Sequence, residues 1–286
     1  MPPSSLQLPP FDPVPWDTIL QGDCLDIASR LPPAIFDFIY MDPPFFTKRD
    51  HHSTSRNDAH TPLTFSDRWS PPKDASAPPP PLPTGDPGLD AYLAWLDLRI
   101  RAQYPLLKPT GVFLLHLDWH AVHYAKVLCD RIFGMDHFQN ELIWYYQTGG
   151  ASKSRFSRKH DTILLYSKGD RFYFNGKAIA IPRTPKALKR AQCPTGARIK
   201  ATDTHKNPDD VLLIPALNPM AKERTGYPTQ KPLALLTTLI KALCPPEGTI
   251  GDLLCGSGVT AIAADALRRS HLWIVADAAP ARRPRP

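Results

Sequence analysis

The sequence predicts an α/β fold in which a doubly wound, mostly parallel sheet presents its functional side chains at one edge. The apolar run 36–41 is typical of a buried strand and ends in Asp-Pro-Pro-Phe at 42–45. Residues 249–268 read as a strand, a Gly-x-Gly turn and an Ala-rich helix. Dinucleotide-binding folds place such a turn after their first strand, whereas Gly258 lies close to the last residue, 286. The other strands must come from earlier in the chain, so the sheet is expected to be circularly permuted.

Most elements before residue 170 follow from short apolar runs bounded by glycine, proline and charged residues. Leu89, Leu93, Leu96 and Ile100 recur at helical spacing and predict an amphipathic helix. The elements expected here are, in chain order, a strand at 18–20, a helix ending at Leu31, the strand 36–41, the helix within 89–107, a strand at 112–117, a helix at 121–133, and strands at 139–146 and 162–166.

Three stretches fall outside this alternation of strands and helices. Residues 1–16 are rich in proline and predict a loose amino-terminal arm. Residues 47–88 are polar, with four prolines in a row from Pro78, a composition that favours polyproline II structure or disorder over a packed core. Residues 174–225 are basic, and a charge run of this kind is usually a solvated face.

The alternation returns around the glycine turn near the end of the chain. We expect a strand at 249–254, a helix at 259–268 and a last strand at 271–276 that ends at Asp277. The turn Gly256-Ser257-Gly258 would open bare backbone amides at a helix N-terminus to a ligand. Asp277 could accept the hydroxyls of a ribose. Both features also fit the fingerprint of a nicotinamide dinucleotide site, and only the late position of the turn argues against that alternative.

The charge and the amino-acid composition of the chain limit the classes of protein to which it can belong. The net charge of +7 favours a polyanionic partner only slightly. Five scattered cysteines without a Cys-x-x-Cys pair argue for a reducing cytoplasm and against a zinc site or a disulfide framework. His116, His120 and His123 straddle a strand-to-helix junction without an acid cluster, and we interpret them as structural. No apolar stretch is long enough to span a membrane and no signal peptide is seen, so no metal and no membrane are expected.

Asp42-Pro43-Pro44-Phe45 has two interpretations. Taken alone, the tetrapeptide is an ordinary strand-ending turn, because proline ends the hydrogen-bonded ladder and presets the bend. Alternatively, a carboxylate, two rigid prolines and an aromatic ring can grip a planar amino-bearing base and present its nitrogen to an electrophile. The glycine turn near the other end of the chain favours the second interpretation.

Further motifs lie between these two. They are Gln21-Gly22-Asp23-Cys24-Leu25-Asp26, Lys108-Pro109-Thr110-Gly111, Ile132-Phe133-Gly134, Asn140-Glu141-Leu142-Ile143-Trp144, and Gly226-Tyr227-Pro228-Thr229-Gln230-Lys231-Pro232. In these motifs and in their order the chain resembles the beta class of amino-methylating DNA methyltransferases. The resemblance covers most of the chain, and it departs from the family at Leu253-Leu254, where Pro-Phe is usual, and at Ile274-Val275-Ala276-Asp277, where Gly-Ile-Asp/Glu is usual.

The resemblance implies a circularly permuted, Rossmann-like methyltransferase sheet with an inserted target-recognition region. The implied divisions are the arm 1–16, a catalytic half 17–173 with the proline-rich loop 47–88, the target-recognition region 174–225, and a cofactor-binding half 226–286. Within the loop, residues 51–69 would lie beside the catalytic turn, as a DNA-contacting loop or as a plain surface loop. The cations of 174–225 would neutralise phosphates.

The resemblance also implies roles for single residues. Catalysis would involve Asp42, Pro43, Pro44 and Phe45. The cofactor, S-adenosyl-L-methionine, would be bound by Asp23, Cys24, Asp42, Thr229, Lys231, Asp252, Cys255, Gly256, Ser257, Gly258 and Asp277. Asp252 and the glycine turn would hold the methionine end and Asp277 the ribose, with Asp23 and Cys24 near the adenine ring. Thr229 and Lys231 would lie near the methionine carboxylate, although Lys231 could equally be a surface lysine at a helix start.

The implied reaction is methyl transfer to the exocyclic N6 of adenine in double-stranded DNA, after the base has left the duplex. N4-methylation of cytosine is the nearest alternative, and enzymes of that kind more often have Ser where this chain has Asp42. A DNA-binding remnant that has lost catalysis is a third hypothesis. A nicotinamide-dependent dehydrogenase is weaker, because it gives Asp-Pro-Pro-Phe no role. A restriction endonuclease partner, a homodimer and a cytoplasmic location are compatible with the resemblance.

Overall fold

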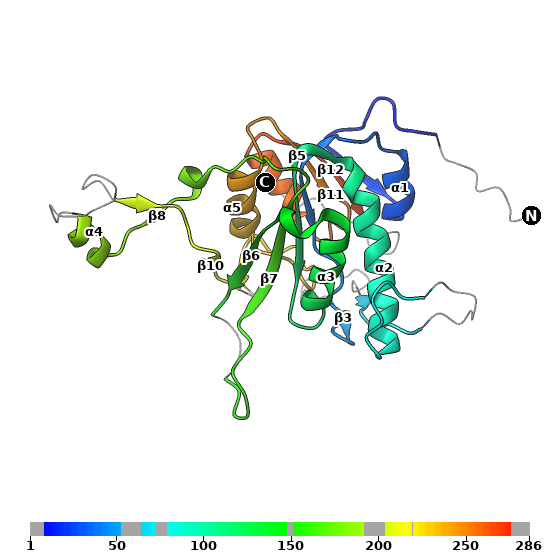
Figure 1. Cartoon of the computed structure of the whole chain (residues 1–286), viewed down its shortest axis with the longest axis horizontal. Coiled ribbons are helices and arrows are strands. Elements are labelled where there is room, and N and C mark those ends of the chain that lie inside the picture. Colours follow the sequence, from blue (N-terminus) through cyan, green and yellow to red (C-terminus); the bar gives the residue numbers. More distant parts are fainter. Residues whose placement is uncertain are drawn as a thin grey trace, which may run out of the picture.

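The structure, a computed structural model, describes residues 9–52, 64–71, 79–147, 151–191, 204–218 and 220–275. Its centre is an eight-stranded sheet with helices on both faces (Figure 1). The strands of this sheet are β1 (Thr18–Gln21), β2 (Phe36–Met41), β5 (Leu107–Leu117), β6 (Phe138–Tyr145), β7 (His160–Ser167), β10 (Val211–Leu213), β11 (Thr249–Asp252) and β12 (Ser270–Val275). The helices are α1 (Cys24–Arg30), α2 (Pro87–Gln103), α3 (Val122–Phe133), α4 (Pro185–Ala191), α5 (Leu233–Leu243) and α6 (Val259–Ala266).

The strand order in the sheet is β1-β12-β11-β2-β5-β7-β6-β10. The strands β1, β12, β11, β2 and β5 run parallel to one another, and β6 runs parallel to β10. Strand β7 is antiparallel to both of its neighbours, β5 and β6. Strands from the end of the chain therefore lie between β1 and β2, and the carboxyl ends of β2, β5, β6 and β11 meet at one edge. The predicted fold class, a doubly wound and mostly parallel α/β sheet, is confirmed.

The two faces of the sheet bury separate hydrophobic cores, as the alternation of side chains along a strand requires. On β2, Ile39 and Met41 pack toward α1, α2 and α3. Their neighbours Phe38 and Tyr40 pack toward α5 and α6 on the opposite face. All four side chains are at most 1% exposed. A strand covered on both faces reads as a continuous apolar run in the sequence, which is why this strand was predictable.

Several predicted boundaries need correction. Strand β5 begins at Leu107 instead of residue 112, because Leu107 pairs with Phe36 across a register shift that absorbs the turn-like Lys-Pro-Thr-Gly sequence. Strand β11 ends at Asp252 and helix α6 at Ala266, both earlier than predicted. Helix α5, which packs against α6, was not among the expected elements. The last strand, β12, is described to Val275, and Asp277 lies outside the described residues.

Residues 47–88 are not only a proline-rich loop. Two short strands within them, β3 (Asp50–His52) and β4 (Thr64–Ser66), pair as an antiparallel hairpin. The segments between and after these strands, 53–63 and 72–78, lie outside the described residues, as do residues 1–8 of the expected arm. Part of the segment 51–69, expected as a DNA-contacting loop or a plain surface loop, is therefore ordered secondary structure next to the turn 42–45.

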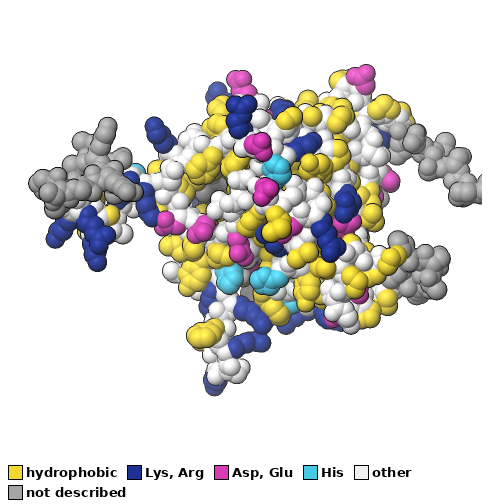
Figure 2. Space-filling model, in the orientation of Figure 1, with side chains coloured by type: hydrophobic (Ala, Val, Ile, Leu, Met, Phe, Trp, Pro, Cys, Tyr) yellow, Lys and Arg dark blue, Asp and Glu magenta, His cyan; other side chains and the backbone are white. Residues whose placement is uncertain are grey.

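The basic region 174–225 divides into two parts. The 3₁₀ helix η3 (Gly176–Ile179) packs against α5, and β8 (Ile181–Pro182), α4 and β9 (His205–Lys206) beyond it belong to an arm that extends away from the sheet (Figure 1). Lys and Arg side chains gather on this arm (Figure 2). Strand β10 then returns and pairs with β6, so this region also supplies the eighth strand of the sheet. Residues 192–203 and 219 lie outside the described residues. None of the helices in the described ranges has the length and apolarity needed to cross a membrane.

Candidate active site

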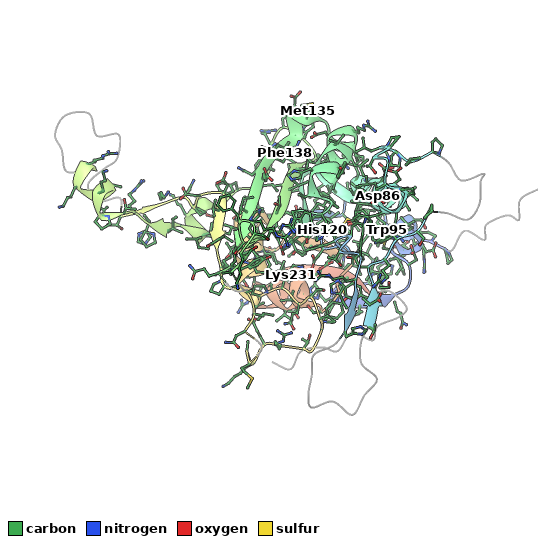
Figure 3. The ribbon with its side chains drawn as sticks, turned by 90° about the horizontal axis from the view of Figure 1, so that it is seen from below. Asp86, Trp95, His120, Met135, Phe138 and Lys231 are labelled. Carbon is green, nitrogen blue, oxygen red and sulfur yellow. The ribbon has the colours of Figure 1, made fainter. Side chains whose placement is uncertain are left out.

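A pocket of about 280 Å³ opens at the edge of the sheet where β2 and β11 end. This volume is close to the lower end of the range for small-molecule sites, roughly 300 Å³. Figure 3 looks onto this edge, and Lys231, His120 and Trp95 lie near the centre of the view. The pocket is lined by Tyr40, Asp42, Pro43, Pro44, Phe45, Thr47, His51, Phe65, Ser66, Asp67, Trp95, Tyr227, Thr229, Lys231, Asp252, Leu254, Cys255, Gly256, Ser257, Val259, Thr260 and Ile274.

The turn 42–45 is held in place by two buried side chains that are distant in sequence. Tyr92 of α2 donates from its hydroxyl to the carbonyl oxygen of Pro44 at 2.7 Å. Burial raises the pKa of Tyr92 well above its ordinary value, so the phenol stays a neutral donor. Asp67, which follows β4 and is fully buried, accepts hydrogen bonds from the backbone N–H groups of Phe46 and Thr47. The hairpin therefore fixes the backbone that follows the turn.

Asp42 forms an ion pair with Lys231. The ammonium Nζ lies 2.7 Å from each carboxylate oxygen, and the side chains are 7% exposed for Lys231 and 21% for Asp42. The same ammonium lies 4.7 Å from the centre of the Phe45 ring, within the range of a cation–π contact. Lys231 is therefore no surface lysine. Its charge compensates and orients the carboxylate at the end of β2.

Phe45 rests on a buried chain of hydrogen bonds. Its ring centre lies 5.7 Å from that of His116, which is fully buried on β5. One nitrogen of His116 lies 2.6 Å from the Tyr40 hydroxyl, and the other lies 3.3 Å from one carboxylate oxygen of Asp161. The second carboxylate oxygen of Asp161 accepts a hydrogen bond from the Tyr146 hydroxyl at 3.1 Å. Burial favours the neutral form of Asp161, but hydrogen bonding and the charge of His116 outweigh it and lower the pKa of Asp161.

Cys255, Gly256 and Ser257 of the glycine turn line the pocket. Gly256 and Gly258 have φ of +49° and +77°, in the left-handed region that favours glycine. A Cβ atom at Gly258 would overlap the ring of Trp273, and one at Gly256 would lie 3.2 Å from the ring of Tyr227. Gly258 also precedes the first residue of α6, so the turn leads directly into a helix N-terminus.

Asp252 ends β11 and is 3% exposed. Burial raises the pKa of Asp252 to about 7, while a hydrogen bond from Thr260 opposes this and the nearby charge of Asp42 adds to it. The backbone N–H of Leu254 also donates to the carboxylate. A buried carboxylate with a raised pKa lacks a full counter-charge, and it would gain most from a cationic ligand group placed against it.

Aromatic side chains close one side of the pocket. Phe65 of β4 stacks on Tyr227, with ring centres 6.2 Å apart, and His51 of β3 stacks on the outer side of Phe65 at 4.8 Å. Burial raises the pKa of Tyr227 to about 12, so its hydroxyl is neutral near pH 7. The β3–β4 hairpin thus contacts Tyr227, the residue that packs beside Gly256 of the glycine turn.

The pocket brings together most of the residues that the sequence singled out. All four residues of the turn 42–45 line it, as do Thr229, Lys231, Asp252, Cys255, Gly256 and Ser257. Asp23 and Cys24 do not line it. Asp23 instead caps α1 through the Leu25 N–H and pairs with Arg99, which lies over the ring of the pocket residue Trp95. Gly258 belongs to the glycine turn but does not itself line the pocket, and Asp277 lies outside the described residues.

Sequence reasoning did not assign the pocket residues Tyr40, Thr47, Trp95, Tyr227, Val259, Thr260 and Ile274. Leu254 was noted only as a departure from the family, and His51, Phe65, Ser66 and Asp67 fall within residues 51–69, which were expected beside the turn 42–45 without individual roles. Tyr227 stands inside a quoted motif and Tyr40 two residues before Asp42, so both could have been found from position. Trp95 of α2 gave no such signal. Across the described ranges, no three His, Cys, Asp or Glu side chains converge as metal ligands would.

The geometry supports a definite chemistry. A carboxylate with an aromatic ring beside it can accept hydrogens from a planar amine while the ring stacks on the same base. A buried acid and open backbone amides lie on the other side of the pocket, where a zwitterionic cofactor end fits. The two functions meet in one cavity because β2 and β11 are neighbours in the sheet.

Comparison with known proteins points to DNA methylases. A family model described as DNA methylase matches residues 36–278. The Type II methyltransferase M.ScaI of Streptomyces caespitosus is 24% identical over 258 residues, covering 86% of this chain and 72% of the relative. The DNA adenine methyltransferase YhdJ of Escherichia coli (strain K12) is 23% identical over 269 residues, covering 90% of this chain and 77% of the relative.

Two solved structures share the fold. The PvuII DNA methyltransferase (cytosine-N4-specific) superposes with a TM-score of 0.60 at 14% identity, covering 91% of this chain and 81% of that one. A putative DNA modification methylase from Thermus thermophilus, complexed with S-adenosyl-L-methionine, superposes with a TM-score of 0.53 at 17% identity, covering 90% of this chain and 86% of that one.

Proposed function

We propose a reaction for this chain from the premise that it belongs to the DNA methylase family, whose model matches residues 36–278. The chain is an S-adenosyl-L-methionine-dependent DNA methyltransferase of the group that modifies N6 of adenine or N4 of cytosine. Within this group we infer the N6 of adenine in double-stranded DNA as the target. The observation that supports the reaction most directly is the Asp42 carboxylate, held by Lys231 beside Phe45 in the pocket.

The residues of the pocket fit S-adenosyl-L-methionine. Asp252 is a buried acid in need of a cation, which the ammonium of the methionine moiety would provide. Gly256 and Ser257 offer open backbone at the start of α6. An ammonium has three donors, so Lys231 can hold Asp42 and, with Thr229, still donate to the methionine carboxylate. Bound there, the cofactor supplies an electrophilic methyl group on a sulfonium.

The remaining cofactor contacts are also proposals. We keep Cys255 at the methionine end and Asp277 at the ribose hydroxyls. Asp23 and Cys24 do not line the pocket, and we propose that they act indirectly. Asp23 pairs with Arg99, and Arg99 lies against the ring of the pocket residue Trp95. In this arrangement Trp95 is the side chain that would meet the adenine ring of the cofactor.

The chain activates the acceptor base by geometry. The amino group of adenine is conjugated with its ring, so its lone pair is poorly available. The Asp42 carboxylate and the Pro43 carbonyl accept the two amino hydrogens and favour a pyramidal nitrogen, while Pro44 keeps the turn rigid. Phe45 stacks on the flipped base and stabilises the developing cation through its ring face. Alignment of the two reactants supplies much of the rate, and the released proton passes to Asp42 or to water.

Two finer points belong to the same proposal. The choice of adenine is supported by Asp42, since the cytosine enzymes that the chain resembles more often have Ser at this position. Assignment to the beta class with a circular permutation is supported by the order of the chain, in which the catalytic strand β2 precedes the cofactor strand β11. The region 174–225 would contact the target sequence, and a restriction endonuclease partner is compatible with this role.

The test is mass spectrometry of nucleosides from the DNA of a methylation-deficient host that expresses the chain. N6-methyladenine is expected for the wild type, and its absence for Asp42→Ala, because the acceptor of the amino hydrogens is removed. Asp42→Ala should still bind S-adenosyl-L-methionine in isothermal titration, within about threefold of wild type. Asp50→Ala, which removes an exposed acid of β3, is the matched control and should keep full activity.

N4-methylcytosine in the wild-type sample would overturn the choice of base and keep the reaction. Transfer by Asp42→Ala at the wild-type rate would overturn the catalytic assignment. A wild-type protein that binds DNA but neither binds the cofactor nor transfers a methyl group would be a non-catalytic remnant.

A further inference from the structure

The turn between β6 and β7 projects from the same edge of the sheet as the pocket (Figure 1). We call its described residues, 151–159, the basic tip. They contain the four cations Lys153, Arg155, Arg158 and Lys159 and no acid. At their centre stands Phe156, whose side chain is 98% exposed. One exposed apolar residue is ordinary on a protein surface, but a phenylalanine surrounded by cations at the substrate edge is not explained by packing.

The basic tip is held in a defined shape. The ladder of β6 and β7 continues to a hydrogen bond from the Tyr146 N–H to the Lys159 carbonyl at 2.8 Å. Further out, the Ser152 N–H donates to the Ser157 hydroxyl across the turn at 3.0 Å. Arg158 lies 3.4 Å over the ring of Trp119, which follows the end of β5. Phe156 is therefore presented outward on a braced turn.

The base of the tip is joined to the pocket by side-chain hydrogen bonds. Tyr146, the residue after β6, donates to Asp161 of β7, and Asp161 faces His116. His116 in turn contacts the hydroxyl of Tyr40, which lines the pocket, and the ring of Phe45. The pocket and the basic tip stand at the same edge of the sheet. A duplex that places a base against Phe45 would therefore also pass along the basic tip.

We propose that the basic tip enters the base stack of duplex DNA, with Phe156 as the wedge that opens or fills the step next to the flipped base. This inference rests on the proposed function, in which the substrate is double-stranded DNA. Lys153 and Arg155 would neutralise the phosphates on both sides of the entry point. The apolar ring would replace stacking that the duplex loses when the step opens.

The experiment compares Phe156→Ala with Met135→Ala. Met135 is 75% exposed in the 3₁₀ helix η2 (Met135–His137), just before β6 begins at the opposite edge of the sheet, and it serves as the control for loss of an exposed apolar side chain. Closed circular plasmid from a methylation-deficient host is relaxed by a type I topoisomerase with each protein bound. The linking number left after the protein is removed reports how far the protein has unwound the duplex.

Wild type and Met135→Ala should lower the linking number, and Phe156→Ala should lose at least half of that shift. Methyl transfer to the same native plasmid should fall about tenfold or more for Phe156→Ala, and its affinity for S-adenosyl-L-methionine should stay within twofold. Lys153→Gln with Arg155→Gln should instead reduce the salt dependence of DNA binding by a slope of about 2, since each phosphate contact contributes roughly 0.9.

Three results would overturn the wedge. One is a wild-type protein that binds plasmid without changing its linking number. Another is a Phe156→Ala variant with the wild-type shift and transfer rate. The third is a change of sedimentation from dimer to monomer in Phe156→Ala, which would make Phe156 a contact between copies of the chain. A wild type that unwinds DNA but transfers no methyl group would reject the proposed reaction and leave the wedge supported.

Discussion

At the scale of single residues, three carboxylates at one edge of the sheet differ in their partners and therefore in what they can do. Asp67 is buried and accepts from the backbone and hydroxyl of Thr47, so its charge is satisfied within the protein. Asp42 is paired with Lys231 but is still partly exposed to the pocket. Asp252 is buried with a raised pKa and has no full counter-charge. The first therefore serves structure, while in the function proposed above the second would meet the acceptor base and the third the cofactor.

The raised pKa of Asp252 predicts how cofactor affinity depends on pH. Above pH 7 the carboxylate is ionised and can pair with the ammonium of S-adenosyl-L-methionine. Below pH 7 the free protein holds a neutral carboxyl group that must lose its proton on binding, so affinity should fall by up to about tenfold for each pH unit between 7 and 5.5. Isothermal titration of wild type and Asp252→Asn over this range measures the effect.

The neutral amide of Asp252→Asn has no proton to lose. Its affinity should be lower at pH 7.5 and nearly independent of pH down to 5.5. Equal slopes for wild type and Asp252→Asn would mean that another group is responsible for the pH dependence.

The sequence allowed single residues of the candidate site to be predicted where they stand inside a recognisable local motif. Asp42, Asp252 and the two glycines stand at strand ends next to turn residues, and the pocket contains or adjoins them all. Tyr92 and Asp67 were missed, because each reaches the catalytic turn from an element far away in the chain. Such partners depend on which elements become neighbours, which a local pattern does not encode.

At the scale of elements, the β3–β4 hairpin braces the backbone after the turn 42–45, and we propose that it also covers the cofactor side of the pocket. Phe65→Ala would remove the ring that stacks on Tyr227 and His51. Because an aromatic pair contributes about 0.5–1.5 kcal/mol, we expect S-adenosyl-L-methionine to bind roughly two- to thirteenfold more weakly. The loss should appear mainly as faster dissociation, measured by stopped-flow fluorescence.

His52→Ala is the matched control for this prediction, since His52 is an exposed residue of the same hairpin, bonds across it to Thr64 and does not line the pocket. It should bind the cofactor like wild type. If Phe65→Ala dissociates no faster than His52→Ala, the hairpin braces the turn without covering the cofactor.

The same hairpin shows why some elements escape prediction. Its strands have three residues each and lie in a segment dominated by proline and polar residues, so composition outweighed the short β pattern. Strand β10 is equally short and follows a basic stretch. Both are stabilised by what they pair with or pack on rather than by their own sequences. The long elements α2, β2 and α3 were predictable because their apolar spacing extends over several turns or a whole buried run.

At the scale of the whole molecule, the order of the strands joins the two ends of the chain into one unit. Strand β12 is hydrogen-bonded to β1 on one side and to β11 on the other. Helices α5 and α6 cover Phe38 and Val112 on the central strands, which would be exposed to water without the carboxyl-terminal segment. The amino-terminal strands β1, β2 and β5 and the carboxyl-terminal strands β11 and β12 therefore share one sheet and its cores.

This arrangement predicts cooperative opening of the whole sheet, which native-state hydrogen exchange measures at low denaturant. Slow amides of β12 near Leu272 and of β7 near Leu164 should exchange with the same free energy of opening, within about 1 kcal/mol. If residues 249–275 opened at a free energy several kcal/mol below that of β7, the cofactor half would be a separate folding unit. Equal free energies of opening would mean that the central strands unfold together. The residues proposed to bind the base and the cofactor would then be lost in the same step, because they come from these strands.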